Sequence, residues 1–476
     1  MSADISPFFL TGPNAAARRR LLLVSWHFAP AQTAGALRWQ KMSRYAAERG
    51  WAIDVITLAP SSLRLADQSS LAELPAGVRL FGVPKRQVWE ERLEDRASQF
   101  RRWLVPSSTP DRIPDSISPA RTAPETESLA PEEIRWRWTT RDLIRAWTAY
   151  LEFRRDGAWA ARVTALGREL GARTRYDAVM SSGPPHLAHS AARRIGEHVG
   201  VPVVLDFRDP FALVRRLPAP IASPLWFALA RRHERPAVAR ARLITVTTDA
   251  LRAALERIYP EARDKIVTVT NGCDDEQITE DGRRERFVIA YAGALYLDRD
   301  PTSFFRAAAA TVRAMQLRPA EFGIDFIGHT ERYGGARLQD LAAAERLEPF
   351  VRVIPQVPRT EALRLMSSAS MLLNLPQDSP YAIPSKVFEY MLFDAWLLVL
   401  ADRGTPTELL LRDTGAHIVA PTDVAGIGAA IRLCMERFRR GERPARISLQ
   451  ERFTRRYQAG LFLDALDRAV FGRTAP

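Results

Sequence analysis

The chain has 476 residues, which is too long for one hydrophobic core and predicts two domains of ordinary size with an insertion. Hydrophobic residues make up 46% of it without a collagen-like or disordered bias, so the chain is expected to be globular. The formal net charge of +13 predicts attraction to an anionic partner, and the absence of an RNA-binding signature, a zinc finger or a basic zipper argues against nucleic acid as that partner.

No stretch approaches about eighteen consecutive apolar residues, and residues 1–14 lack a basic segment followed by a long apolar one. The chain is therefore expected to remain in the cytoplasm. Its two cysteines, Cys273 and Cys434, argue against a disulfide framework, and neither lies near a Cys or His at metal-ligand spacing. No metal is expected.

The N-terminal part predicts the opening of a doubly wound nucleotide-binding fold. A buried strand is expected over residues 21–26, a loop of small residues over 27–36, a helix over 37–49 and a second strand over 51–58. Gly35 is the loop position at which the backbone is best able to approach a ligand closely. A plain strand-to-helix connection explains the same loop equally well.

The alternation of strands and helices stops between about Gln87 and Arg155. Residues 89–104 predict an amphipathic charged helix, and residues 105–131, rich in Pro, Ser and Thr, predict a mobile loop. Trp136, Trp138 and Trp147 then lie among arginines in a predicted aromatic and basic helix. This insertion is either a lid, an acceptor or partner surface, a membrane-contacting element or a packed helical hairpin.

Two predicted strands deliver polar residues at their carboxyl ends, where ligands of open parallel sheets gather. The strand at 176–182 leads into Gly183-Pro184-Pro185-His186 with His189 one turn further on, and the strand at 201–205 leads into Asp206-Phe207-Arg208-Asp209-Pro210. The two histidines are either site residues or helix-capping and core residues. The three charged residues are either site residues or an internal ion pair that supports a loop.

Residues 219–235 are apolar and end in arginines. They predict either an interfacial helix that buries Leu225, Trp226, Phe227 and Leu229 among anionic lipid head groups, or a core helix.

The second half repeats the strand and helix alternation. Strands are predicted at 287–291, 322–328, 350–354, 369–375, 396–400 and 416–419, and a helical tail at 453–471. After the first of these strands comes Ala292-Gly293-Ala294, and residues 274–286 form the predicted linker between the halves.

The stretch Ile383-Pro384-Ser385-Lys386-Val387-Phe388-Glu389-Tyr390-Met391 predicts a helix with two faces. An apolar stripe lies on one face, while Lys386 and Glu389, three residues apart, share the other. A lysine at the start of a helix suits a diphosphate, and a carboxylate one turn on suits the hydroxyls of a ribose. An ordinary amphipathic surface helix is the alternative.

Three motifs resemble one family: Pro-Ser-Lys-Val-Phe-Glu-Tyr-Met, Ser-Gly-Pro-Pro-His-x-x-His and Asp-Phe-Arg-Asp-Pro. They are similar to the retaining GT-B glycosyltransferases of family four, in particular to members that assemble exopolysaccharides and O-antigens. The resemblance covers nearly the whole chain except about 87–155. It implies two Rossmann-like domains, an acceptor domain at 18–273 and a donor domain at 284–445, with residues 446–476 crossing back to the first.

The resemblance also implies roles for individual residues. Glu389 binds the ribose of a UDP- or GDP-linked sugar, and its diphosphate is held by Gly293, Arg299, Ser385 and Lys386 without a metal. The implied catalytic residues are His186, Asp206, Arg208 and Asp209, and the residues of the cleft and acceptor side are Gly35, Arg38 and His189. Many relatives carry a histidine where Arg208 aligns.

The chain departs from the family motifs at three further places. Tyr381 stands where the family has a Glu, and Leu392-Phe393-Asp394 replace its glycines. Ala294 and Asp300 occupy the positions of an Arg and a Lys that neutralise the diphosphate, with Arg299 as a neighbouring substitute.

We therefore expect a bacterial glycosyltransferase that moves a sugar from a nucleotide sugar to a saccharide or lipid-linked acceptor, in the cytoplasm or against the anionic inner face of the plasma membrane. The alternative is a catalytically weak relative that binds a nucleotide sugar or glycan as an assembly partner.

Overall fold

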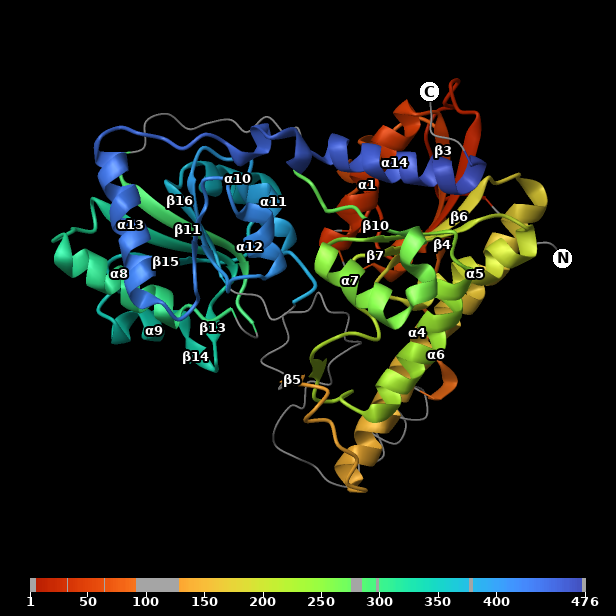
Figure 1. The fold of residues 1–476 in the computed structure, drawn as a ribbon, viewed down its shortest axis with the longest axis horizontal. Coiled ribbons are helices and arrows are strands. Elements are labelled where there is room, and N and C mark those ends of the chain that lie inside the picture. Colours follow the sequence, from red (N-terminus) through yellow and green to blue (C-terminus); the bar gives the residue numbers. More distant parts are fainter. Residues whose placement is uncertain are drawn as a thin grey trace. The chain divides into compact units, whose positions relative to one another are not determined.

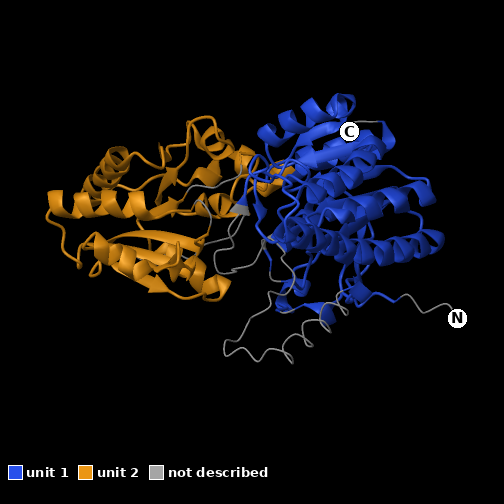
Figure 2. Ribbon diagram, turned by 90° about the horizontal axis from the view of Figure 1, so that it is seen from below, with its two compact units in different colours: residues 1–121, 127–270, 459–476 blue, residues 122–126, 271–458 orange. Residues whose placement is uncertain are grey.

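The computed structural model describes residues 6–31, 33–63, 65–90, 128–274, 285–296, 299–375 and 380–472. The chain divides into two compact units, which Figure 2 draws in different colours. The first comprises residues 1–121, 127–270 and 459–476, and the second comprises residues 122–126 and 271–458. Most of the helix predicted at 89–104 and most of the loop predicted at 105–131 lie outside the described residues.

Among the described residues of the first unit, eight strands form a sheet in the order β1-β4-β3-β2-β6-β7-β9-β10. Figure 1 labels β3, β4, β6, β7 and β10 of this sheet. The strands are β1 (Phe9–Leu10), β2 (Arg19–Ser25), β3 (Trp51–Leu58), β4 (Val78–Val83), β6 (Ala178–Gly183), β7 (Val203–Phe207), β9 (Leu243–Val246) and β10 (Ile266–Thr268). Strand β1 is antiparallel to β4, and the other pairs are parallel. The strand order reverses between β2 and β6, which is where open parallel sheets bind ligands.

Helices pack on this sheet from both sides. They are α1 (Ala34–Glu48), α2 (Ser69–Ala72), α4 (Thr140–Arg173), α5 (Leu187–Val199), α6 (Pro224–Arg240), α7 (Asp249–Ile258) and α14 (Arg455–Phe471). Helices α1 and α14 share one core cluster, in which the rings of Trp39 and Phe462 meet edge to face at 5.1 Å. Helix α5 packs against β6 and β2 and is flanked by α4 and α6.

The second unit contains a parallel sheet in the order β15-β12-β11-β16-β17-β18. Its strands are β11 (Phe287–Ala294), β12 (Phe322–His329), β15 (Val351–Ile354), β16 (Met371–Asn374), β17 (Trp396–Leu400) and β18 (His417–Val419). Its helices are α8 (Thr302–Ala314), α9 (Leu338–Ala344), α10 (Arg359–Ser367), α11 (Ser385–Tyr390), α12 (Pro406–Leu411) and α13 (Val424–Arg439). The order reverses between β11 and β16, so the carboxyl ends of these two strands form the expected ligand edge.

Short elements complete the chain. Strand β5 (Ser128–Leu129) pairs with β8 (Leu217–Pro218), and β13 (Arg332–Tyr333) pairs with β14 (Ala336–Arg337). The 3-10 turns are η1 (Pro60–Ser62), η2 (Pro260–Lys265), η3 (Ile447–Leu449) and η4 (Glu451–Phe453). The α/β class with two parallel, Rossmann-like sheets, as in the GT-B fold, is confirmed.

The structure corrects the start of one predicted helix and decides between the two alternatives for another. Helix α4 begins only at Thr140, because Thr139 and Asp142 form a capping box, so Trp136 and Trp138 precede the helix. In α6, Trp226 is only 6% exposed and packs on Phe153, so the four apolar residues of 225–229 do not share a lipid-facing side. This is the core-helix alternative. No described helix is both long and apolar enough to cross a membrane.

We predict that Gly328→Ala destabilises the second unit. Gly328 has φ +108°, and an added Cβ would lie 2.4 Å from the carbonyl oxygen of Gly293 on the neighbouring strand. The free energy of opening β11 and β12, measured by hydrogen exchange, should fall by about 3 kcal/mol. Gly404→Ala is the control, because its φ of +83° is strained but nothing lies within 4 Å of the new Cβ, so about 1 kcal/mol is expected there. Equal losses in the two variants would contradict the backbone clash.

Candidate functional site

The ligand edge of the second sheet brings together Tyr291, Gly293, Arg299 and Lys386, which we call the donor cluster. Gly293 lies near the end of β11 with φ +138°. A Cβ built on it would lie 3.6 Å from Lys386 Nζ and 3.8 Å from the Tyr291 hydroxyl. Because Gly293 has no side chain, no side-chain atom from the end of β11 stands against the lysine ammonium.

Lys386 Nζ lies 3.7 Å from the centroid of the Tyr291 ring. Although the residue as a whole is partly exposed, Nζ itself has almost no exposed surface and no hydrogen-bond partner among the described residues. Burial, and secondarily the charge of Arg299, hold the pKa of Lys386 well below its usual value. An ammonium without a hydrogen-bond partner is costly to bury, so a bound anion would stabilise its charged form.

Arg299 is the second cation of the donor cluster. Its Nη1 donates to the carbonyl oxygen of Ala294 at 3.0 Å, and its guanidinium lies 4.2 Å from the Tyr296 ring centroid. Tyr390 ties the short helix α11 to β11, because its hydroxyl accepts from the Ala292 N–H at 2.9 Å and donates to the Ala292 carbonyl oxygen at 3.2 Å. These contacts place both cations at the end of one strand.

Glu389 forms an ion pair with Arg359, a residue of α10 that sequence reasoning did not single out. Both side chains are partly exposed, at 30% and 42%. An exposed ion pair contributes only about 1 kcal/mol or less, so hydroxyl groups of a ligand are able to compete for the carboxylate. Ser385 is exposed at the start of α11, and Val387, Phe388 and Met391 are buried as predicted.

Helix α11 is shorter than its apolar stripe suggests, since it spans only six residues, Ser385–Tyr390. Pro384 precedes it as the N-cap residue and does not lie within its first turn. Two buried side-chain oxygens have no partner among the described residues: Oδ1 of Asn374, the last residue of β16, and Oγ1 of Thr330, which follows β12. No sequence motif indicated these two residues.

In the first unit, Asp206 is the centre of a buried hydrogen-bond network. Its carboxylate accepts from Arg38 Nη2 at 3.1 Å and Nε at 3.3 Å, from Trp39 Nε1 at 2.8 Å, from Ser182 Oγ at 2.9 Å and from Thr245 Oγ1 at 2.9 Å. Arg38 also donates to the carbonyl oxygens of Val269 and Thr270. Asp206 is 0% and Arg38 3% exposed, so their ion pair is internal, as the ion-pair alternative for Asp206 expects.

His186 and His189 lie together beside this network. Ser181 Oγ and His189 Nδ1 are 2.8 Å apart, and His189 Nε2 lies 3.5 Å from His186 Nδ1. Burial lowers the pKa of His189 to about 3 and holds that of His186 well below its usual value. Both rings are therefore neutral near pH 7 and are able to donate or accept hydrogen bonds, but they are weak general bases.

Arg208 contacts the segment after β6, at Gly183 and Pro184, and the start of α1, at Gly35. Its Nε donates to the Gly183 carbonyl oxygen at 2.9 Å and its Nη2 to that of Pro184 at 2.7 Å. A Cβ on Gly35 would lie 2.0 Å from Arg208 Nη1, so the group that closely approaches this glycine is a side chain of the protein itself. Asp209, next along the chain, is exposed.

His27 is a site residue that the sequence analysis missed. It follows β2, its Nδ1 lies 3.2 Å from Thr33 Oγ1, and burial and then Arg208 lower its pKa to about 3. The only sequence signal was its place in the loop after a strand. In the part of the chain that the structure describes, no group of His, Cys, Asp and Glu residues is placed to hold a metal ion.

The two parallel sheets, each with polar residues at its point of strand reversal, define an α/β protein with the GT-B fold. Residues 118–277, which include His186, His189 and Asp206, match the family profile described as glycosyltransferase family 4. No curated protein matches the chain.

Solved structures share the fold over nearly the whole chain. A glycosyltransferase from Rickettsia africae has a TM-score of 0.58 and 10% identity, over 96% of this chain and 100% of the other. A UDP-forming trehalose-phosphate synthase from Burkholderia xenovorans has 0.57 and 14%, over 95% and 99%. Anabaena HepE in complex with UDP has 0.55 and 13%, over 94% and 99%.

We predict that Asp206→Ala lowers the free energy of unfolding of the first unit by about 3–5 kcal/mol, because it leaves the Arg38 guanidinium buried without its carboxylate. Denaturant titration followed by circular dichroism measures the loss. Asp209→Ala is the control: it removes the same side chain three positions further along, where the residue is exposed, and should change stability by no more than about 0.5 kcal/mol. An Asp206→Ala protein as stable as the wild type would show that the network does not support the fold.

Proposed function

We propose that this chain is a retaining glycosyltransferase that moves a sugar from a nucleotide sugar to a saccharide or lipid-linked acceptor in bacterial polysaccharide assembly, at the cytoplasmic side of the membrane. The observation that carries the proposal is the buried ammonium of Lys386, which lacks a hydrogen-bond partner among the described residues and lies beside Gly293. The family-four signature of residues 118–277 supports it, as do the structures of Anabaena HepE with UDP and with UDP-glucose.

In this proposal the donor cluster holds the diphosphate of the nucleotide sugar. The Lys386 ammonium and the Arg299 guanidinium neutralise the charge that grows on the leaving group as the glycosidic bond breaks. Gly293 has no side chain to keep the phosphate oxygens away. Because α11 has only six residues, we assign this stabilisation mainly to the two cations and not to the helix dipole.

Glu389 would bind the ribose hydroxyls after the Arg359 ion pair opens. The acceptor hydroxyl attacks from the face of the leaving group, and a phosphate oxygen takes its proton, so no protein base is required. His186 and His189, both neutral, would orient the acceptor through hydrogen bonds, while Arg38 and Asp206 hold the loops that carry them. Asp209 is exposed and available to a sugar hydroxyl.

One observation favours a second candidate, a binder of nucleotide sugars with weak turnover. Ala294 and Asp300 stand where the family carries two cations, which leaves Arg299 as the neighbour of Lys386. A single substitute guanidinium gives less stabilisation to a departing diphosphate than a matched pair does.

We predict that Lys386→Ala lowers the release of nucleoside diphosphate by about two orders of magnitude, because loss of a charge-assisted contact to the leaving group costs roughly 2–4 kcal/mol. The assay mixes purified protein with a panel of nucleotide sugars and a lipid extract. Lys41→Ala is the matched control, since it removes the same group from an exposed ion pair with Glu73. Stabilisation by UDP without release from the wild type in any mixture would favour the binder.

We also predict that UDP binds more weakly as pH rises. The pKa of Lys386 is depressed in the free protein and rises when the diphosphate binds, so binding takes up a proton. The affinity for UDP is therefore highest below the pKa that Lys386 has in the free protein. It falls as the pH rises from that value towards the higher pKa that Lys386 has in the UDP complex. Calorimetric titration between about pH 7 and 9, where the phosphates are already ionised, measures this slope.

Lys386→Arg is the control for the pH dependence, because a guanidinium stays protonated throughout this range. Its UDP affinity should be nearly flat with pH. A wild-type affinity that is equally flat would contradict the proposed contact between Lys386 and the diphosphate.

A further inference from the structure

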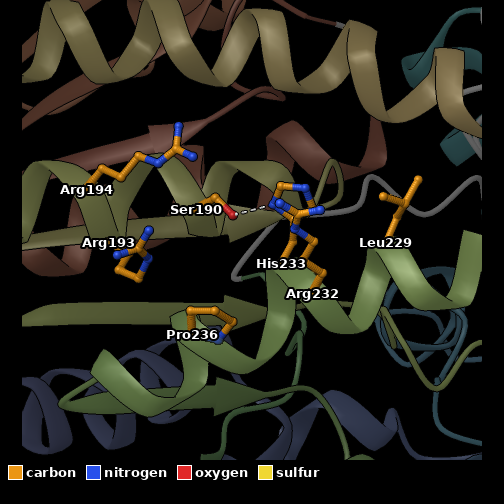
Figure 3. Close-up of a pocket in the computed structure, with 7 residues that line it drawn as sticks. All are labelled: Ser190, Arg193, Arg194, Leu229, Arg232, His233 and Pro236. Atoms are coloured by element: carbon orange, nitrogen blue, oxygen red, sulfur yellow. Dashed lines mark hydrogen bonds between the residues drawn. The ribbon is translucent and has the colours of Figure 1, made fainter.

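A second cationic site lies in the first unit, between α5 and α6, and shares no residue with the catalytic, donor-binding and cleft residues predicted from the sequence. It is a cavity of about 250 Å³, shown in Figure 3. Its lining consists of Ser190, Arg193 and Arg194 from α5 and of Leu229, Arg232, His233 and Pro236 from α6. Three of these seven side chains are guanidinium groups.

Of the three arginines that line the cavity, only Arg193 is paired with a carboxylate among the described residues. Arg193 pairs with Glu197, one turn further along α5, with Nη1 2.7 Å from each carboxylate oxygen. Arg194 and Arg232 are exposed, and neither forms an ion pair or a side-chain hydrogen bond within the described residues. The cavity therefore presents two uncompensated positive charges and one that is compensated.

His233 lines the same cavity as the three arginines. Its Nδ1 lies 3.2 Å from Ser190 Oγ, and its ring stacks on Phe153 at 5.9 Å. The pKa of His233 is lowered by burial and then by the charges of Arg194, Arg232 and Arg193. Burial favours the neutral ring first, and the charges of arginines on both helices add to that effect.

We infer that this α5–α6 cavity binds a phosphate group, carried either by a soluble phosphate compound or by an anionic lipid. Guanidinium groups match phosphate oxygens with paired N–H donors, and Arg194 and Arg232 have such donors free. The Ser190 hydroxyl offers a further polar contact, and Leu229 forms an apolar wall. The volume corresponds to about eight water molecules, which leaves room for a phosphate and some of its hydration.

The test starts from full-length Lys386→Ala protein, so that phosphate does not occupy the proposed donor site and the two sites are measured separately. Inorganic phosphate is titrated by calorimetry at low ionic strength, where exposed charges are least screened. In a second arm, co-sedimentation compares vesicles of phosphatidylcholine with vesicles that also contain phosphatidic acid. Binding in either arm supports the inference and identifies the source of the phosphate, and binding in neither arm overturns it.

The assignment to this cavity depends on a matched pair of double variants. Arg194→Gln with Arg232→Gln should weaken phosphate binding at least about tenfold, because charge-assisted contacts are lost. Arg231→Gln with Arg235→Gln removes the same charge from exposed positions of α6 outside the cavity and should leave affinity within about twofold. All four arginines are exposed, so both proteins should fold as the parent does. Equal losses of phosphate affinity in the two double variants would show that phosphate is attracted by the general surface charge of α5 and α6, and would overturn the assignment to the cavity.

His233 gives a readout that does not depend on affinity. A phosphate in the cavity offsets the charges of Arg193, Arg194 and Arg232, so the pKa of His233 should rise when phosphate is added. Proton NMR follows the ring resonance, which is assigned by its loss in His233→Gln. A His233 pKa that does not move at saturating phosphate would place the bound anion elsewhere and overturn the inference.

Discussion

The ammonium of Lys386 is held at the end of a parallel strand with an aromatic ring beneath it and no hydrogen-bond partner among the described residues. Such a group is unfavourable in the free protein, and its depressed pKa expresses that cost. The surrounding structure maintains it nonetheless, because Gly293 lacks a side chain and Tyr390 fixes α11 against β11. A bound anion would accept the hydrogen bonds that the Lys386 ammonium does not make within the protein, which is the physical basis of the proposed donor site.

The ligand edge of the first sheet is organised in the opposite way. Asp206 is buried as well, but each of its oxygens accepts hydrogen bonds from several donors, and Arg38 is compensated in turn by two carbonyl groups. A fully satisfied network of this kind makes a rigid support for the loops around it. The histidines beside it are neutral, so this edge offers hydrogen bonds to a ligand where the donor cluster offers charge.

The α5–α6 cavity differs from the donor cluster in the solvent exposure of its positively charged side chains. Arg194 and Arg232 are exposed and hydrated, whereas the Lys386 ammonium is removed from water. Exposed charges are strongly screened by salt and buried ones much less, so the two sites are expected to respond differently to ionic strength. Guanidinium groups also keep their charge at every physiological pH, while the protonation of a buried lysine depends on what is bound.

The α/β class, most strands and the buried face of α11 followed from local patterns, because apolar runs and helical spacing express which side chains must leave water. The motif residues also lay where strands end. What the sequence did not show was which distant groups meet: Asp206 with Arg38, 168 positions away, and Glu389 with Arg359, 30 positions away. These partners are brought together by strand order and helix packing, and local periodicity carries no information about that order. Only the tertiary structure, therefore, distinguished the satisfied charge of Asp206 from the unsatisfied charge of Lys386.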